Sequence, residues 1–166
     1  MNHIESYFAY DDTVFNKFEY ANSRVDETEF DQCTFTQCDF HETEFFNCRF
    51  NACKFVACNL NLITLEDCSF RDVSFSTCKM VGINWLAADW PKLGSQASIS
   101  FQECQLDYST FIGLNLPKLK LAKCSLKDIE FSDAQLVGAD FRDSILTASR
   151  FNNTNLSETN FEGAKG

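Results

Sequence analysis

The chain has 166 residues, a hydrophobic content of 45% and a formal net charge of −10, which fits one domain with a sizeable core. The acidic balance argues against direct binding to nucleic acid or to an anionic membrane surface. No apolar run approaches the length of a membrane span, and residues 1–12 are neither basic nor apolar enough for a signal peptide. We therefore expect a cytoplasmic protein without membrane contact.

A repeat with a period of five begins early in the chain and is clearest between Thr28 and Phe55. Every fifth residue from Phe30 is a phenylalanine, and each of these follows a small residue by two positions. The phenylalanines are Phe30, Phe35, Phe40, Phe45, Phe50 and Phe55, and the small residues are Thr28, Cys33, Cys38, Thr43, Cys48 and Cys53. This period matches neither the 3.6 of a helix nor the simple alternation of a strand, so it indicates an internal repeat.

The repeat extends over nearly the whole chain with one interruption. It runs through residues 8–90, stops at the Pro- and Gly-containing segment 91–98, and resumes one residue out of phase over 99–164. One extra residue is a small loop or bulge rather than a domain boundary. We therefore predict a single domain, 1–166, made of a first block (8–90), a loop (91–98) and a second block (99–164).

The physical chemistry of the repeat predicts an all-β solenoid. Two residues spaced by two point the same way on an extended segment, and the short polar residues between pairs suit a turn. One such unit cannot bury anything alone, but coiling the chain and stacking the coils makes a continuous core. The pattern does not fix how many pentads make one coil.

The motif of a small residue, a polar residue, Leu or Phe and two variable residues resembles the pentapeptide-repeat family. This resemblance implies a right-handed quadrilateral β-helix with four pentads per coil and about eight coils. Residues twenty apart would then stack, as in one ladder of Phe30, Phe50 and Phe70 and another of Phe35, Phe55 and Phe75.

The chemistry-bearing residues give no sign of catalysis. All nine cysteines occupy the small inward position of the repeat, so we interpret them as free core thiols: Cys33, Cys38, Cys48, Cys53, Cys58, Cys68, Cys78, Cys104 and Cys124. Their spacing is not that of a zinc site. Cys38 points inward and His41 outward, so they cannot form a nucleophile–base pair. We expect no enzyme activity, no metal and no cofactor.

The charged residues are distributed unevenly over the four expected sides. Acids are concentrated on the side of Val25, Phe45 and Leu65 and on the adjacent side of Tyr10, Phe30, Phe50 and Phe70. On the assumption that loop 91–98 preserves the order of sides, Leu106 joins Trp85 and Phe111 joins Trp90. An acidic rod about as wide as a duplex could enter a basic DNA-binding groove. The alternative is a solvated surface that keeps the protein soluble.

The segments CKMVGINWLAADWP (78–91) and SFQECQLDYSTFIGL (100–114), with FVACNLNL (55–62), resemble the topoisomerase-protecting branch of the family. That branch includes the Qnr quinolone-resistance proteins, McbG and, most similar, AlbG. The resemblance implies a DNA mimic that binds DNA gyrase or topoisomerase IV and protects it from a quinolone-like drug or a peptide toxin. The expected partner-binding residues are Asp26, Glu27, Glu29, Asp31, Glu44, Glu66, Asp67, Asp72, Trp90, Pro91, Lys92, Leu93 and Gly94.

Two further expectations concern assembly. The relatives typically end in an apolar segment that caps the rod and mediates dimerisation, whereas this chain stops at FEGAKG, just after Phe161. The last coil would then expose its Phe/Leu layer, so we expect one of three arrangements: a shortened chain, a homodimer packed through the C-terminal end, or a frayed end. The alternative function is a non-catalytic scaffold that uses the side of Phe35, Phe55 and Phe75. Its outward residues are small and nearly uncharged: Thr34, Thr36, Gln37, Val56, Ala57, Ser74, Ser76 and Thr77.

Overall fold

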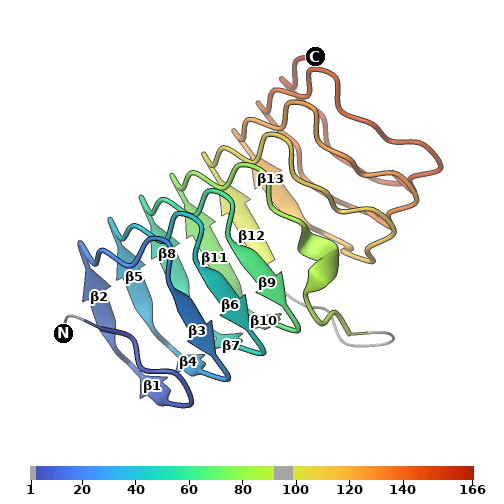
Figure 1. The fold of residues 1–166 in the computed structure, drawn as a ribbon. Helices are drawn as coiled ribbons and strands as arrows, with labels where there is room; N and C mark the ends of the chain where they lie inside the picture. Colours follow the sequence, from blue (N-terminus) through green and yellow to red (C-terminus); the bar gives the residue numbers. More distant parts are fainter. Residues whose placement is uncertain (1–2, 92–98) are drawn as a thin grey trace.

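The computed structural model describes residues 3–91 and 99–166. Short strands and sharp corners wind the chain into a stack of coils, with the two termini at opposite ends (Figure 1). The strands are β1 (Ala9–Asp11), β2 (Val14–Asn16), β3 (Arg24–Asp26), β4 (Glu29–Asp31), β5 (Thr34–Thr36), β6 (Glu44–Phe46), β7 (Arg49–Asn51), β8 (Lys54–Val56), β9 (Thr64–Glu66), β10 (Ser69–Arg71), β11 (Val73–Ser76), β12 (Ile99–Gln102) and β13 (Lys120–Ala122), and the 3₁₀-helix η1 spans Trp85–Ala87.

The coils have four sides, as the resemblance to the pentapeptide-repeat family implies. Three sides are parallel sheets, which we name after one strand each: the β4 side (β1, β4, β7, β10), the β5 side (β2, β5, β8, β11, β12, β13) and the β6 side (β3, β6, β9). The bridge side is a ladder of isolated parallel bridges that links Glu19, Asp39, Asn59, Lys79, Gln105, Ser125, Ile145 and Lys165. The predicted all-β quadrilateral solenoid is confirmed.

Regular strands cover fewer turns than the eight coils expected. The longest sheet has six strands, and after β13 the sides are joined only by isolated bridges. In the second block inward small residues donate their N–H to the carbonyl three residues earlier, as Ser144 does to Phe141 (3.2 Å) and Thr154 to Phe151 (3.2 Å). The corners of this block are thus closed by turn bonds within the chain segment as well as by bonds between coils.

Stacked aromatic rings fill the core of the first block. Phe30 stacks on Phe50 with ring centroids 5.0 Å apart, and Phe35 stacks on Phe55 at 4.5 Å. Rings on adjacent sides meet edge to face, as Phe30 and Phe35 do at 5.5 Å and 70°. Stacked and T-shaped pairs are the favoured aromatic geometries. The predicted ladders of residues twenty apart are therefore confirmed.

Corner residues adopt left-handed backbone conformations, even where they are not glycine. Gln32 (φ 53°) and Asp67 (φ 57°) are examples. This conformation is disfavoured for L-residues. The stack compensates because each corner N–H donates to the next coil, as Gln32 does to the Asn51 carbonyl at 2.9 Å. Hydrogen bonding between coils, rather than glycine content, therefore sets the corners.

The order of sides across residues 92–98 differs from the sequence-based assignment. Strand β11 pairs with β12 in the register Phe75↔Phe101, and Trp85 stacks on Phe111 at 5.5 Å. Phe101 lies 26 residues after Phe75, six more than a regular coil of 20, so the second block is displaced by one side. The expectation that Leu106 lies on the same side as Trp85 is wrong. The bridge between Lys79 and Gln105 places Leu106 on the bridge side, stacked on Met80.

Candidate interaction surface

The β6 side carries the highest density of acidic groups. Its strands show an exposed–buried–exposed or exposed–buried–intermediate pattern, because only the central side chain points into the core. The flanking and corner positions therefore present their charges to solvent. From β3 onward, this side and the corner that follows it carry seven acids, Asp26, Glu27, Glu44, Glu66, Asp67, Glu130 and Asp133, against two bases, Arg24 and Arg150.

The adjacent β4 side is also acidic in the first block. With its corners it carries six acids, Asp11, Asp12, Glu29, Asp31, Asp72 and Asp89, against the bases Arg49 and Arg71. The β5 side, opposite the β6 side, is mixed, since Lys120 and Arg142 lie near Asp140 and Asp143. Eight expected contact residues thus fall on two adjacent sides, as the sequence analysis inferred for the first block.

Four of the expected contact carboxylates are engaged within the chain. Arg24 contacts both Asp26 (Nε–Oδ1, 2.8 Å) and Glu44 (Nη1–Oε2, 3.1 Å), and these hydrogen bonds raise the pKa of its guanidinium. Arg49 pairs with Glu29, and the Asn51 amide donates to Asp31 at 2.6 Å.

The other four acids have no such partner among the described residues. Glu27, Glu66, Asp67 and Asp72 form no intrachain ion pair within 3–91 and 99–166. Glu66 and Asp67 are both exposed next to each other at the end of β9. These carboxylates are therefore the groups most available to a positively charged partner.

The expected loop contacts are only partly described. Trp90 stacks on Phe70 at 6.0 Å, and its indole N–H donates to the Trp85 carbonyl at 2.7 Å. Its ring is thus attached to the core, while Pro91 is exposed. Lys92, Leu93 and Gly94 lie outside the described residues.

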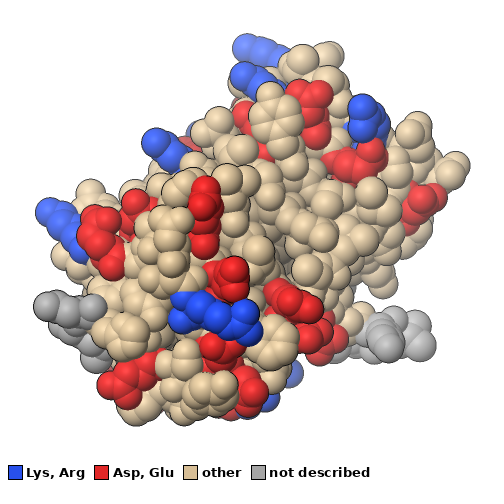
Figure 2. Space-filling view, viewed as in Figure 1, with Lys and Arg blue, Asp and Glu red and all other residues tan. Residues whose placement is uncertain are grey.

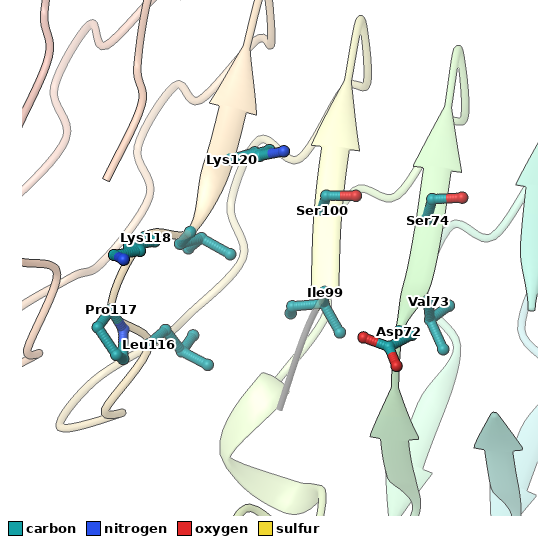
Figure 3. A pocket seen from close by; sticks show the side chains of 10 residues that line it. Asp72, Val73, Ser74, Ile99, Ser100, Leu116, Pro117, Lys118 and Lys120 are labelled. Atoms are coloured by element: carbon teal, nitrogen blue, oxygen red, sulfur yellow. The ribbon is translucent and has the colours of Figure 1, made fainter. Parts of the chain in front are cut away.

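A hollow of about 300 Å³ opens beside β11 and β12 (Figure 3). Ser74, Ser100 and Lys120 come from three adjacent strands, in register along its edge, and Asp72 and Lys118 lie nearby. Nucleophilic catalysis by serine needs an adjacent base such as histidine. The lining residues contain none, and His41 instead contacts Glu42 at 3.2 Å on another side.

The cysteines have a structural role that sequence analysis only partly anticipated. All nine are free and buried. In the first block each thiol donates to a carbonyl of the coil below, as Cys53 does to Phe30 (3.3 Å) and Cys58 to Phe35 (3.4 Å). Thr43 makes the same bond to Tyr20 at 2.7 Å. The small inward position is therefore a donor position between coils. Within the described part of the chain, no group of three His, Cys, Asp or Glu side chains could hold a metal ion.

Sequence analysis missed one feature of the β6 side. In the coil that follows β9, the strand is replaced by η1, whose N-cap Asn84 accepts from the Leu86 N–H at 3.1 Å. Trp85, the first residue of η1, is fully buried and its large ring fills the coil centre. Leu62, Leu86, Tyr108 and Ile112 are exposed around this element. The available signal was their apolar character at repeat positions that elsewhere hold polar residues.

Comparison with known proteins assigns the chain to a family. The family model described as pentapeptide repeat region matches residues 28–111 and 95–161, so the chain belongs to the pentapeptide-repeat family. A comparison with curated proteins finds no match. No helix among residues 3–91 and 99–166 has the length and apolar character needed to cross a membrane.

Several solved structures are similar to this chain. One is QnrB1, a plasmid-mediated fluoroquinolone resistance protein (20% identity, covering 95% of this chain and 91% of that chain, TM-score 0.33). Another is HetL from the cyanobacterium Nostoc, involved in heterocyst differentiation regulation (12%, 97% and 86%, TM-score 0.34). A third is a pentapeptide repeat protein from the Arabidopsis thaliana thylakoid lumen (13%, 80% and 67%, TM-score 0.31).

Proposed function

We propose that this protein is a non-catalytic DNA mimic that binds DNA gyrase or topoisomerase IV in the cytoplasm and protects it from a quinolone-like drug or a peptide toxin. One observation carries the proposal: carboxylates without an ion pair among residues 3–91 and 99–166 lie on two adjacent sides of a rod, at Glu27, Glu66, Asp67 and Asp72. A basic groove that neutralises phosphates attracts such carboxylates by the same electrostatics. The resemblance of residues 78–114 to the topoisomerase-protecting branch supports the choice of target.

The proposal predicts a charge-dependent effect on gyrase. The purified protein is added to a supercoiling assay at micromolar concentration, with and without a quinolone. We expect inhibition of supercoiling or relief of quinolone inhibition, and we expect either effect to weaken as salt is raised. Neither inhibition nor protection at low salt would refute the proposal.

A pair of variants separates specific from general charge effects. Glu66→Lys/Asp67→Lys reverses two free charges on the β6 side. Glu103→Lys/Asp143→Lys makes the same change in net charge at exposed corners of the opposite β5 side. The first variant should lose most activity and the second little. Equal effects would indicate that only net charge matters, and an unaffected first variant would favour the alternative scaffold function.

A further inference from the structure

Four large apolar side chains are exposed together at the middle of the most acidic side. Their exposed fractions are 47% for Leu62, 42% for Leu86, 65% for Tyr108 and 39% for Ile112. Leu86 belongs to η1, and the Asn84–Thr110 bridge sets Ile112 in register on the next coil. Leu62 and Tyr108 lie at the corner between the bridge side and the β6 side. Apolar side chains gathered on one exposed surface mark interaction sites more often than single exposed residues do.

Hydrogen bonds between coils hold these residues in one surface. The Leu62 N–H donates to the Val81 carbonyl (2.9 Å) and the Gly82 N–H to the Asp107 carbonyl (3.0 Å), so Leu62, Gly82 and Tyr108 are successive corners. The lack of a side chain at Gly82 leaves room for Leu62, because a Cβ at position 82 would lie 2.8 Å from Leu62 Cδ2. The Leu62 side chain therefore lies over Gly82 in the gap below Tyr108. We call the resulting uncharged surface the central patch: Leu62, Thr64, Asn84, Leu86, Tyr108, Thr110 and Ile112.

Acidic residues border the central patch at both ends. Toward the N-terminus the border is Glu42, Glu44, Glu66 and Asp67, and toward the C-terminus it is Asp128, Glu130 and Asp133. Glu44 and Glu130, which pair with Arg24 and Arg150, mark the two borders in one column four coils apart, roughly 19 Å at the usual strand spacing. Figure 2 shows the uncharged surface around η1 between groups of acidic side chains.

This arrangement differs from the charge pattern of DNA. A duplex presents phosphates without an apolar interruption, on the order of one charge per 1.7 Å of helix axis. The β6 side instead has two acidic groups separated by a surface that includes an exposed tyrosine. Protein interfaces commonly combine an apolar centre, in which tyrosine is frequent, with a charged rim.

We propose that the central patch is the anchor of a protein interface, and that its partner presents an apolar protrusion between two basic clusters about 20 Å apart, the distance expected from four strand spacings. This inference rests on the proposed function and specifies where the contact is made. A protein surface of the topoisomerase, next to its basic DNA-binding groove, packs against η1 and Ile112. The acidic borders steer association, and the patch slows dissociation.

The test measures binding kinetics of the full chain on immobilised intact gyrase at several salt concentrations. Leu86→Ser/Ile112→Ser removes the centre of the patch without changing net charge. We expect Kd to rise at least about tenfold, mainly through faster dissociation, with an unchanged salt dependence. Val14→Ser/Val56→Ser is the matched control, because it removes two exposed aliphatic side chains (69% and 37%) from the β5 side.

A third variant keeps the test independent of folding. Tyr108→Ser changes the most exposed of the four side chains and should raise Kd severalfold with an unchanged melting temperature. If wild type binds gyrase and the patch variants bind with the same Kd as the control, the inference is overturned and the proposed function stands. Absence of wild-type binding at low salt would overturn both.

Discussion

Replacing Phe55 with alanine tests whether the aromatic ladder holds the coils together. Phe55 is 3% exposed and stacks between Phe35 (4.5 Å) and Phe75 (5.0 Å), with Phe50 at its edge (5.9 Å). Truncating a buried phenylalanine costs about 3–5 kcal/mol, and aromatic pairs contribute about 0.5–1.5 kcal/mol each beyond area burial. Because these terms overlap, we expect the free energy of unfolding to fall by about 4–6 kcal/mol.

The same change at the last rung supplies the comparison. Phe161 is 37% exposed and stacks on Phe141 from one side at 5.1 Å. In a solenoid each repeat contacts only its neighbours, so Phe161→Ala should fray the terminal coil and cost about 1 kcal/mol or less.

Urea unfolding followed by circular dichroism and by the fluorescence of Trp85 and Trp90 measures both variants. The two tryptophans are in the middle of the rod and therefore report on its interior. A loss below about 1.5 kcal/mol for Phe55→Ala, well under the usual cost of a buried phenylalanine, would refute the ladder argument. Equal losses for the two variants would refute the nearest-neighbour reasoning.

Three further predictions concern buried or paired polar groups. Asp107 is 5% exposed and accepts from the Ser125 hydroxyl (2.7 Å) and the Lys127 N–H (2.9 Å), so Asp107→Ala should lower the urea-derived stability by about 2–3 kcal/mol. Burial raises the pKa of the Cys124 thiol to about 12. Below about pH 8.5 the thiol is protonated in both the folded and the unfolded protein, so its contribution to the free energy of unfolding is complete. This contribution falls as the pH rises toward 12, because the unfolded thiol then loses its proton before the folded one does. The stability difference between wild type and Cys124→Ala should change in that direction in alkaline urea titrations, and a constant difference would contradict it. The hydrogen bond from Arg142 lowers the pKa of the Asp140 carboxyl. Wild type should therefore melt at a higher temperature than Asp140→Asn above the ordinary carboxyl pKa, and this difference in melting temperature should disappear as the pH falls through the lowered pKa.

Much of the candidate surface was readable from the sequence, but its free charge was not. The repeat places Glu44, Glu66 and Asp67 at outward positions, because only two positions in five point inward. Whether Glu44 and Glu29 are neutralised depends on arginines twenty positions away in the sequence. Arg24 contacts Glu44 and Arg49 contacts Glu29 only when the coils stack. The unpaired acids therefore emerge only from the three-dimensional arrangement.

The sequence by itself determined the solenoid, its inward positions and the burial of its cysteines, because a strict period of five repeats the same burial choice in every pentad. It could not determine the order of sides across residues 92–98. An insertion of one residue and an insertion of six shift the five-residue repeat by the same amount. They differ by five residues, which is one full side of the coil, so the repeat pattern cannot distinguish them. Only the hydrogen-bonded pairing of β11 with β12 selects six. That pairing stacks Trp85 on Phe111 and thereby brings Leu86 beside Ile112, so the central patch is a product of the tertiary structure.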